Sequence, residues 1–172
     1  MITKPFSPRD IFAQPVVNSS RVFLSPQRYI QGPGVIKNCG LYLSLINAKH
    51  VGVLASKRGF SAEAANVLQS LSEAGIEYSK AEFRGECSKE EVERHTNDLM
   101  SAKPDCILAV GGGKLVDAGK CIAYRLNCQV GIIPTLASND APCSSISVLY
   151  TVDGVKDIVE YFPQNPAFVI VD

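Results

Sequence analysis

Two segments of the sequence combine residue types that could bind a small polar ligand. The first is the run Gly111-Gly112-Gly113-Lys114, which follows an apolar stretch and precedes a helical pattern. Glycine carries no Cβ atom, so a phosphate group could approach main-chain N–H groups at the positive end of the following helix. The run matches neither the G-x-G-x-x-G pattern nor the Walker A pattern. Phosphate binding and a plain tight turn therefore both remain open.

The second segment, residues 134–145, follows another apolar stretch and is rich in hydroxyl groups, with one amide and the carboxylate of Asp140. Small polar groups after a buried strand can line a sugar or polyol site. They can equally cap a helix, with Ser138 or Asp140 at the N-cap and Pro142 in the first turn. Near the first segment, Asp117 falls in the first helical turn, where we expect it to hydrogen-bond a ribose or an amide rather than a phosphate.

The elements that would position these segments alternate between short apolar runs and amphipathic helical stretches. Helices are expected over about 34–46, 61–74, 88–103 and 115–126, and strands over about 51–55, 76–83, 106–110, 130–133 and 167–172. This order predicts an α/β fold with a parallel sheet covered by helices on both faces. Asp153-Gly154 lies between two further strand-like runs and predicts a β-hairpin near the C-terminal end. Ser88 and Glu91 fit a capping box, in which Glu91 reaches back to the N-cap amide.

Composition excludes several classes of partner. The 17 basic and 17 acidic residues cancel, so no nucleic acid and no membrane is expected as a partner. No apolar run approaches the length of a membrane span, and residues 1–20 lack the features of a secretory signal. We expect a flexible tail over residues 1–20, a single domain over 21–172, a cytoplasmic location and mostly buried, reduced cysteines. The two histidines, His50 and His95, are expected at the surface.

Taken together, the segments GGGKLVDAGK (residues 111–120) and PTLASNDAP (residues 134–142) resemble the glycerol dehydrogenases. These belong to the metal-dependent alcohol dehydrogenase and dehydroquinate-synthase-like superfamily. Further similarity lies at residues 29–34, 85–88, 147–151 and 165–166, so the resemblance spans about residues 23–172. It implies a Rossmann-like N-terminal domain that binds NAD, and a helical second domain that is absent from this chain.

The resemblance also implies roles for individual residues. Asp140 would be the catalytic and substrate-binding carboxylate that holds the polyol hydroxyls. The cofactor-binding residues would be Ser56, Gly111, Gly112, Gly113, Lys114, Leu115, Val116, Asp117, Thr135, Leu136, Ala137, Ser138, Ser144, Ile146 and Tyr150. The implied reaction is NAD-dependent oxidation of glycerol, or a related vicinal diol, to dihydroxyacetone. The family's zinc ion would be held by one Asp and two His that this chain does not contain, and a homo-oligomer is expected.

Ser56 stands where this family typically has an aspartate that bonds the adenosine ribose. With Lys57 and Arg58 beside it, a serine would tolerate a 2′-phosphate, so NADP use is one interpretation and solvated loop charges are the other. Two further functions stay open: a glycerol-1-phosphate dehydrogenase-like enzyme and a non-catalytic dinucleotide-binding remnant. The sequence fits either a fragment or a naturally short product.

Overall fold

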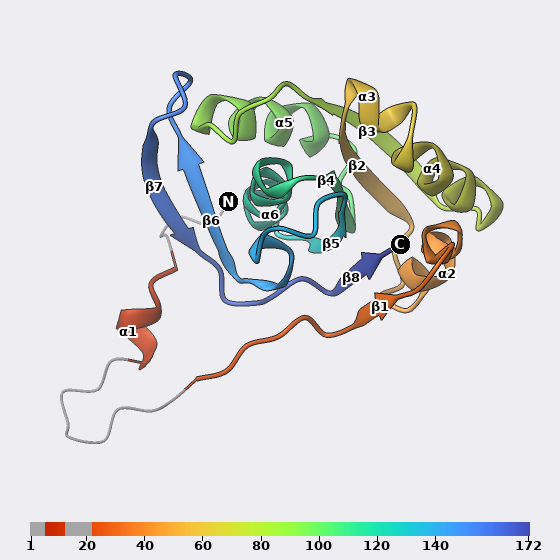
Figure 1. Ribbon diagram of the computed structural model, residues 1–172, viewed down its shortest axis with the longest axis horizontal. Coiled ribbons are helices and arrows are strands. Elements are labelled where there is room, and N and C mark those ends of the chain that lie inside the picture. Colours follow the sequence, from red (N-terminus) through yellow and green to blue (C-terminus); the bar gives the residue numbers. More distant parts are fainter. Residues whose placement is uncertain (1–5, 13–21) are drawn as a thin grey trace.

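The computed structural model describes residues 6–12 and 22–172. Its centre is a six-stranded parallel sheet in the order β1-β8-β5-β4-β2-β3 (Figure 1). The strands are β1 (Tyr29–Gln31), β2 (His50–Ser56), β3 (Glu77–Phe83), β4 (Cys106–Gly111), β5 (Gln129–Pro134) and β8 (Phe168–Val171). The helices are α1 (Pro8–Phe12), α2 (Cys39–Ser44), α3 (Lys57–Phe60), α4 (Glu63–Glu73), α5 (Lys89–Met100) and α6 (Gly113–Leu126), with short 3₁₀ turns η1 (Val35–Asn38) and η2 (Ala141–Cys143). The sheet and its covering helices confirm the predicted α/β class.

The sheet is buried on both faces. Helices α2 and α4 cover one face, where they pack on strand residues such as Val53 and Leu108. Helices α5 and α6 cover the other face, where they pack on Leu54 and Ile107. Successive strand residues point to opposite faces, so a strand between two helical layers must be apolar at nearly every position. This explains why the central strands read as continuous apolar runs rather than as alternating ones.

The order in which strands are added to the sheet reverses between β2 and β4. From β2 it crosses to β3 on one side, and it then returns to form β4 on the other side of β2, with Ala55 in register with Val110. Helices that leave two such neighbouring strands diverge to opposite faces, and a crevice opens outside the carboxyl ends of the strands. Here the segments that follow those ends begin at Lys57 and Gly112.

The predicted hairpin is present as β6 (Ile146–Tyr150) and β7 (Lys156–Tyr161), an antiparallel pair outside the main sheet. Figure 1 shows it beside α6. The Glu160 carboxylate holds the Arg125 guanidinium of α6 through N–O distances of 2.7 and 3.0 Å. The Tyr124 and Phe162 rings lie 5.3 Å apart, centroid to centroid. The hairpin is thus attached to the helix that begins at the triple glycine.

Most of the predicted tail, residues 1–5 and 13–20, lies outside the described residues; between these ranges α1 forms a short helix with no buried residue. One local prediction differs from the structure after β2. Lys57 and Arg58, interpreted as loop residues, belong to the short helix α3. The helix forms because the Ser56 hydroxyl accepts a hydrogen bond from the Gly59 amide at 3.0 Å, which is an N-cap.

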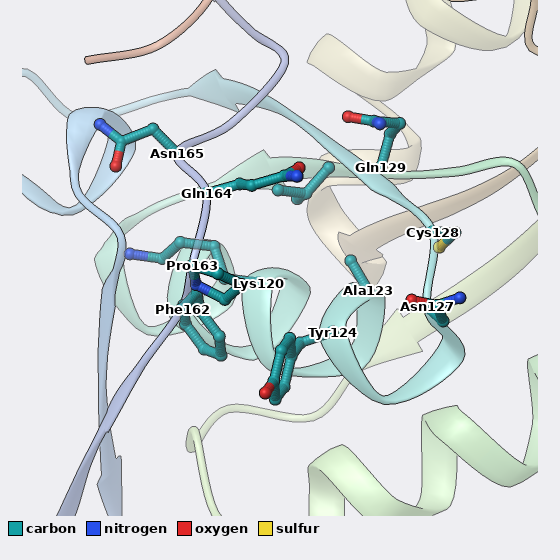
Figure 2. Close-up of a pocket in the computed structure, with 11 residues that line it drawn as sticks. Lys120, Ala123, Tyr124, Asn127, Cys128, Gln129, Phe162, Pro163, Gln164 and Asn165 are labelled. Carbon is teal, nitrogen blue, oxygen red and sulfur yellow. The ribbon is translucent and has the colours of Figure 1, made fainter. Parts of the chain in front are cut away.

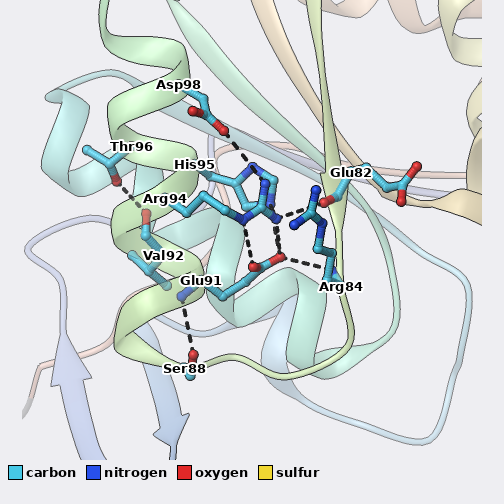
Figure 3. A network of polar contacts seen from close by, with 9 residues as sticks. All are labelled: Glu82, Arg84, Ser88, Glu91, Val92, Arg94, His95, Thr96 and Asp98. Atoms are coloured by element: carbon cyan, nitrogen blue, oxygen red, sulfur yellow. Dashed lines mark hydrogen bonds and ion pairs between the residues drawn. The ribbon is translucent and has the colours of Figure 1, made fainter. Parts of the chain in front are cut away.

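The expected surface position of His95 is wrong, because its side chain is only 1% exposed. Its ring Nε2 lies 3.1 Å from Glu91 Oε1, between α5 and β3 (Figure 3). Glu91 does not complete the capping box: Oε1 accepts from the Arg84 amide at 2.8 Å and from Arg94 at 2.6 Å. Ser88 does cap α5, since its hydroxyl accepts from the Glu91 amide at 3.2 Å.

Candidate functional site

A cleft of about 960 Å³ lies at the carboxyl ends of β2, β3, β4 and β5, where the strand order reverses. Its walls come from the segments that follow these four strands. They comprise Ser56, Lys57, Arg58, Gly59, Glu63, Glu82, Phe83, Arg84, Gly85, Val110, Gly111, Gly112, Gly113, Lys114, Leu115, Thr135 and Leu136. The cleft therefore brings together the triple glycine, the end of β2 and the beginning of the polar loop after β5.

Helix α6 begins in this cleft without a side-chain cap. Gly112 is its N-cap residue and supplies no side chain, and no side-chain hydrogen bond caps the helix. The first turn of an α-helix has N–H groups without intrahelical partners, and its partial positive charge attracts anions. The geometry therefore suits a phosphate or diphosphate at Gly113, Lys114 and Leu115.

The loop after β5 lies against the glycine bend and narrows it. A Cβ atom at Gly112 would come within 3.1 Å of Leu136 Cδ1, and one at Gly113 within 3.4 Å of Asn139 Oδ1. Leu136 is 58% exposed, so a ligand that enters the bend can displace its side chain. The absence of Cβ atoms at these positions is what leaves room for any ligand.

Lys114 is held beside the cleft by an acidic partner. Its Nζ lies 2.6 Å from Glu86 Oε2 and 5.6 Å from the centroid of the Tyr150 ring. The hydrogen bond to Glu86 raises the pKa of Lys114. The ammonium group is thus charged and exposed close to the start of α6, where it can add to the attraction for an anion.

The structure separates the predicted cofactor-binding residues into four groups. Those that line the cleft are Ser56, Gly111, Gly112, Gly113, Lys114, Leu115, Thr135 and Leu136. Ala137 and Ser138 are exposed on the loop after β5, whereas Ser144, Ile146 and Tyr150 lie on the hairpin side, outside the lining of the cleft. Val116 and Asp117 are buried within α6.

Asp117 differs from its expected role. Its Oδ2 accepts a hydrogen bond from the Val148 amide at 3.0 Å, and its Oδ1 lies 2.9 Å from Lys120 Nζ. The Asp117 carbonyl also accepts from the Ser147 hydroxyl at 2.9 Å. The carboxylate is therefore directed at the hairpin, where it joins α6 to β6, and not at a ribose or amide in the cleft.

Asp140, the expected substrate carboxylate, is exposed at the start of η2 and makes no side-chain capping hydrogen bond. Asp140 is thus the N-cap residue that the helix-cap interpretation names, with Pro142 in the first turn, but its carboxylate does not act as the cap. Its carboxylate is free of that local role and can meet a ligand from outside.

Two further features of the site escaped the sequence analysis. Arg84 joins Lys57 and Arg58 in the cleft wall because β3 pairs with β2 in register, which no local pattern reveals. Lys120 is buried and contacts the loop that contains Asp140. The only indication of Lys120 in the sequence is its i,i+3 spacing from Asp117, which places the two side chains on one helix face.

The described residues do not fit a metal ion. Within residues 6–12 and 22–172, no group of three or more His, Cys, Asp or Glu side chains is placed to hold one. His50 Nε2 pairs with the Ser79 hydroxyl at 2.9 Å, and His95 is buried against Glu91. Over the same residues, no helix has the length and apolar character of a membrane span.

Comparison with known proteins agrees with this architecture. The family model for iron-containing alcohol dehydrogenase matches residues 26–172. The chain belongs to this family. It is 40% identical over 152 residues to a glycerol dehydrogenase of Escherichia coli O6:H1, an alignment that covers 88% of this chain and 41% of that protein. The chain thus spans less than half the length of the glycerol dehydrogenases that it matches.

Solved structures show the same relationship. A probable glycerol dehydrogenase from Sinorhizobium meliloti 1021 superposes with a TM-score of 0.81 at 35% identity, over 89% of this chain and 41% of that one. A shorter sequence match has a higher identity: a glycerol-1-phosphate dehydrogenase [NAD(P)+] of Methanococcus aeolicus is 49% identical over 63 residues, which cover 37% of this chain and 17% of that protein.

Proposed function

We propose that this family member supplies the cofactor-binding half of an NAD-dependent enzyme that oxidises glycerol, or a related small vicinal diol, to dihydroxyacetone. One observation carries the proposal: the uncapped start of α6 opens into a cleft of about 960 Å³ at the point where the strand order reverses. In open α/β sheets this is the place where nucleotides bind. The similarity to glycerol dehydrogenases supports the choice of a polyol substrate.

The proposed cofactor fits the residues that line the cleft. The amides of Gly113, Lys114 and Leu115 would hold the diphosphate, with the Lys114 ammonium as a neighbouring charge. Thr135 and Leu136 line the same cleft as Ser56 and would contact the flanking parts of the dinucleotide. The bound nicotinamide would supply the hydride acceptor, while the protein binds and orients it.

The exposed Asp140 carboxylate would accept hydrogen bonds from polyol hydroxyls. In the longer enzyme, Asp140→Asn should leave cofactor affinity nearly unchanged while it raises the KM for glycerol. An unchanged KM would remove Asp140 from the substrate site. Because the described residues do not fit a metal, the chemistry proposed for this chain is confined to cofactor binding and substrate orientation.

Nucleotide preference follows from the cations around Ser56. Lys57, Arg58 and Arg84 line the same cleft, and Ser56 offers no carboxylate to repel a 2′-phosphate. We therefore propose that the chain binds NADP(H) as well as NAD(H). Parallel titrations with the two reduced cofactors test this, and a strong preference for NADH would remove it.

The proposal is tested by titrating the 172-residue chain with NADH and with ADP-ribose, using calorimetry or nucleotide fluorescence. Saturable one-site binding of both ligands is expected. If neither binds, the chain does not form a dinucleotide site by itself. Binding in a longer natural product without turnover of any diol would instead favour the non-catalytic remnant.

A second candidate is a glycerol-1-phosphate dehydrogenase-like enzyme, which the short match at 49% identity favours. Both candidates use the same cofactor cleft, so cofactor binding does not separate them. Turnover by the longer enzyme does: glycerol oxidation supports the first, and oxidation of glycerol 1-phosphate alone supports the second.

A further inference from the structure

Lys120 is a buried cation whose partners lie on a different segment of the chain. It is on α6 and only 3% exposed. Its Nζ donates to the carbonyls of Ala141, at 2.9 Å, and Ile146, and lies 3.3 Å from the Ser144 hydroxyl. Figure 2 shows the Lys120 side chain extending from α6 toward the neighbouring loop. A buried ammonium persists only when it is paired and hydrogen-bonded, so these contacts account for its presence.

The contacted loop is the one that contains the proposed substrate residue. Ala141 directly follows Asp140, and Ser144 and Ile146 lie just beyond η2. Each bond from Lys120 therefore fixes the backbone on the C-terminal side of Asp140. The loop has two other anchors, since the Asn165 side-chain amide donates to the Cys143 carbonyl and the Phe162 amide donates to the Ser145 carbonyl, each at 2.8 Å. Lys120 is the contact that joins the loop to α6.

The partner of Lys120 on its own helix completes the arrangement. Asp117 Oδ1 lies 2.9 Å from Lys120 Nζ, and Asp117 Oδ2 accepts from the Val148 amide of β6. The pair thus joins one helix, α6, to both the loop and the hairpin. The start of that same helix is the proposed diphosphate site.

We infer that Lys120 is a positioning residue: its ammonium fixes the loop 140–146 relative to the phosphate-binding end of α6. This inference rests on the proposed function for its consequence, the alignment of the nicotinamide and polyol regions with the diphosphate. It adds to the proposal a residue that contacts neither cofactor nor substrate.

The test compares Lys120→Met, which keeps the apolar stem and removes the ammonium, with the wild-type chain. Amide hydrogen exchange should rise in residues 135–146 and stay unchanged in β2, β4 and the start of α6. NADH affinity should fall about tenfold, as expected for the loss of one or two contacts, while ADP-ribose affinity stays within about twofold. Lys37→Met, which removes an exposed lysine on η1, is the matched control and should change neither.

A second variant separates positioning from general stability. Lys120→Ala leaves a space beside the carboxylate of Asp117 and the carbonyls of Ala141 and Ile146, a set of oxygens suited to a cation. Propylammonium should restore both NADH affinity and slow exchange in the loop. Tetramethylammonium, which has the same charge and no N–H donor, should restore neither.

Three results would overturn the inference. The first is unchanged hydrogen exchange in the loop when the ammonium is removed. The second is an equal loss of NADH and ADP-ribose binding with faster exchange throughout the domain, and the third is equal rescue by propylammonium and tetramethylammonium. If the wild-type chain binds neither nucleotide, the proposed function fails. The loop exchange and its rescue by propylammonium then still decide whether Lys120 fixes the loop.

Discussion

Substitution of Gly112 by valine probes the proposed diphosphate site with little effect on folding. Gly112 has φ −81° and ψ 178°, a conformation open to any L-residue, so the new side chain adds no backbone strain. The added Cβ would lie 3.1 Å from Leu136 Cδ1, and the largely exposed leucine can rotate away. We expect Gly112→Val to change the free energy of unfolding by about 1 kcal/mol or less.

The effect on binding should be much larger. The valine methyl groups would occupy the space through which a diphosphate reaches the first-turn amides of α6. A hydrogen bond to a charged group contributes about 1.5–3 kcal/mol. Loss of two such bonds amounts to about 3–6 kcal/mol, which corresponds to roughly a 10²- to 10⁴-fold weaker affinity for NADH.

Calorimetric titration with NADH measures this loss, and far-UV circular dichroism with a urea melt checks the fold. Ala102→Val, an apolar enlargement between α5 and β4, where it is remote from the cleft lining, serves as the control and should bind NADH normally. An affinity of Gly112→Val for NADH within about threefold of wild type would show that diphosphate binding does not depend on close approach to this bend, contrary to the proposal.

Three other changes test the nucleotide preference, a carboxylate that caps a distant turn, and the buried histidine. Ser56→Asp keeps an N-cap for α3 and adds a negative charge, so NADP(H) affinity should fall about tenfold relative to NAD(H), and an unchanged ratio in paired titrations would count against the 2′-phosphate hypothesis. Asp172→Ala removes the carboxylate that accepts from the Gly34 and Ile36 amides, at 2.9 and 3.0 Å, and should lower the free energy of unfolding by about 1 kcal/mol. These bonds lower the pKa of Asp172, so the wild type should lose its advantage as acid protonates the carboxylate. A difference between the two proteins in urea melts that stays constant from neutral to acid pH would contradict this. Burial lowers the pKa of His95, so as pH falls below about 6.5 the unfolded chain takes up the proton before the folded chain does, and the free energy of unfolding falls. His95→Gln should make the free energy of unfolding depend less on pH between 7 and 5, and an unchanged slope in that range would disprove it.

The sheet and most of its helices could be predicted from local patterns, because each pattern is stable in only one kind of packing. An apolar run such as Val51–Ala55 can be buried on both faces only in the middle of a layered sheet, and the helical stretches between such runs must cover it. Asp153 and Gly154 similarly marked the hairpin turn, because glycine adopts the positive φ of 80° found there without strain. The glycine run was likewise predicted to lie between a strand and a helix, and it does lie between β4 and α6.

What the sequence could not supply are contacts between segments far apart in the chain. His95 lies among charged neighbours on α5, yet it faces the core and pairs with Glu91. Asp117 was expected at a ligand, but β6 brings the Val148 amide to it across 31 positions. Lys120 is buried for the same reason: its acceptors come from a loop whose path depends on the whole sheet.

The most direct test of a diphosphate site at the start of α6 is an amide-resolved NMR titration of the ¹⁵N-labelled chain with NADH. We expect saturable shifts of the Gly112, Gly113, Lys114 and Leu115 amides at a common dissociation constant, with smaller changes across the rest of the cleft. NADH binding that leaves these four amides unmoved, or no binding at all, would contradict the claim that the start of α6 holds a diphosphate.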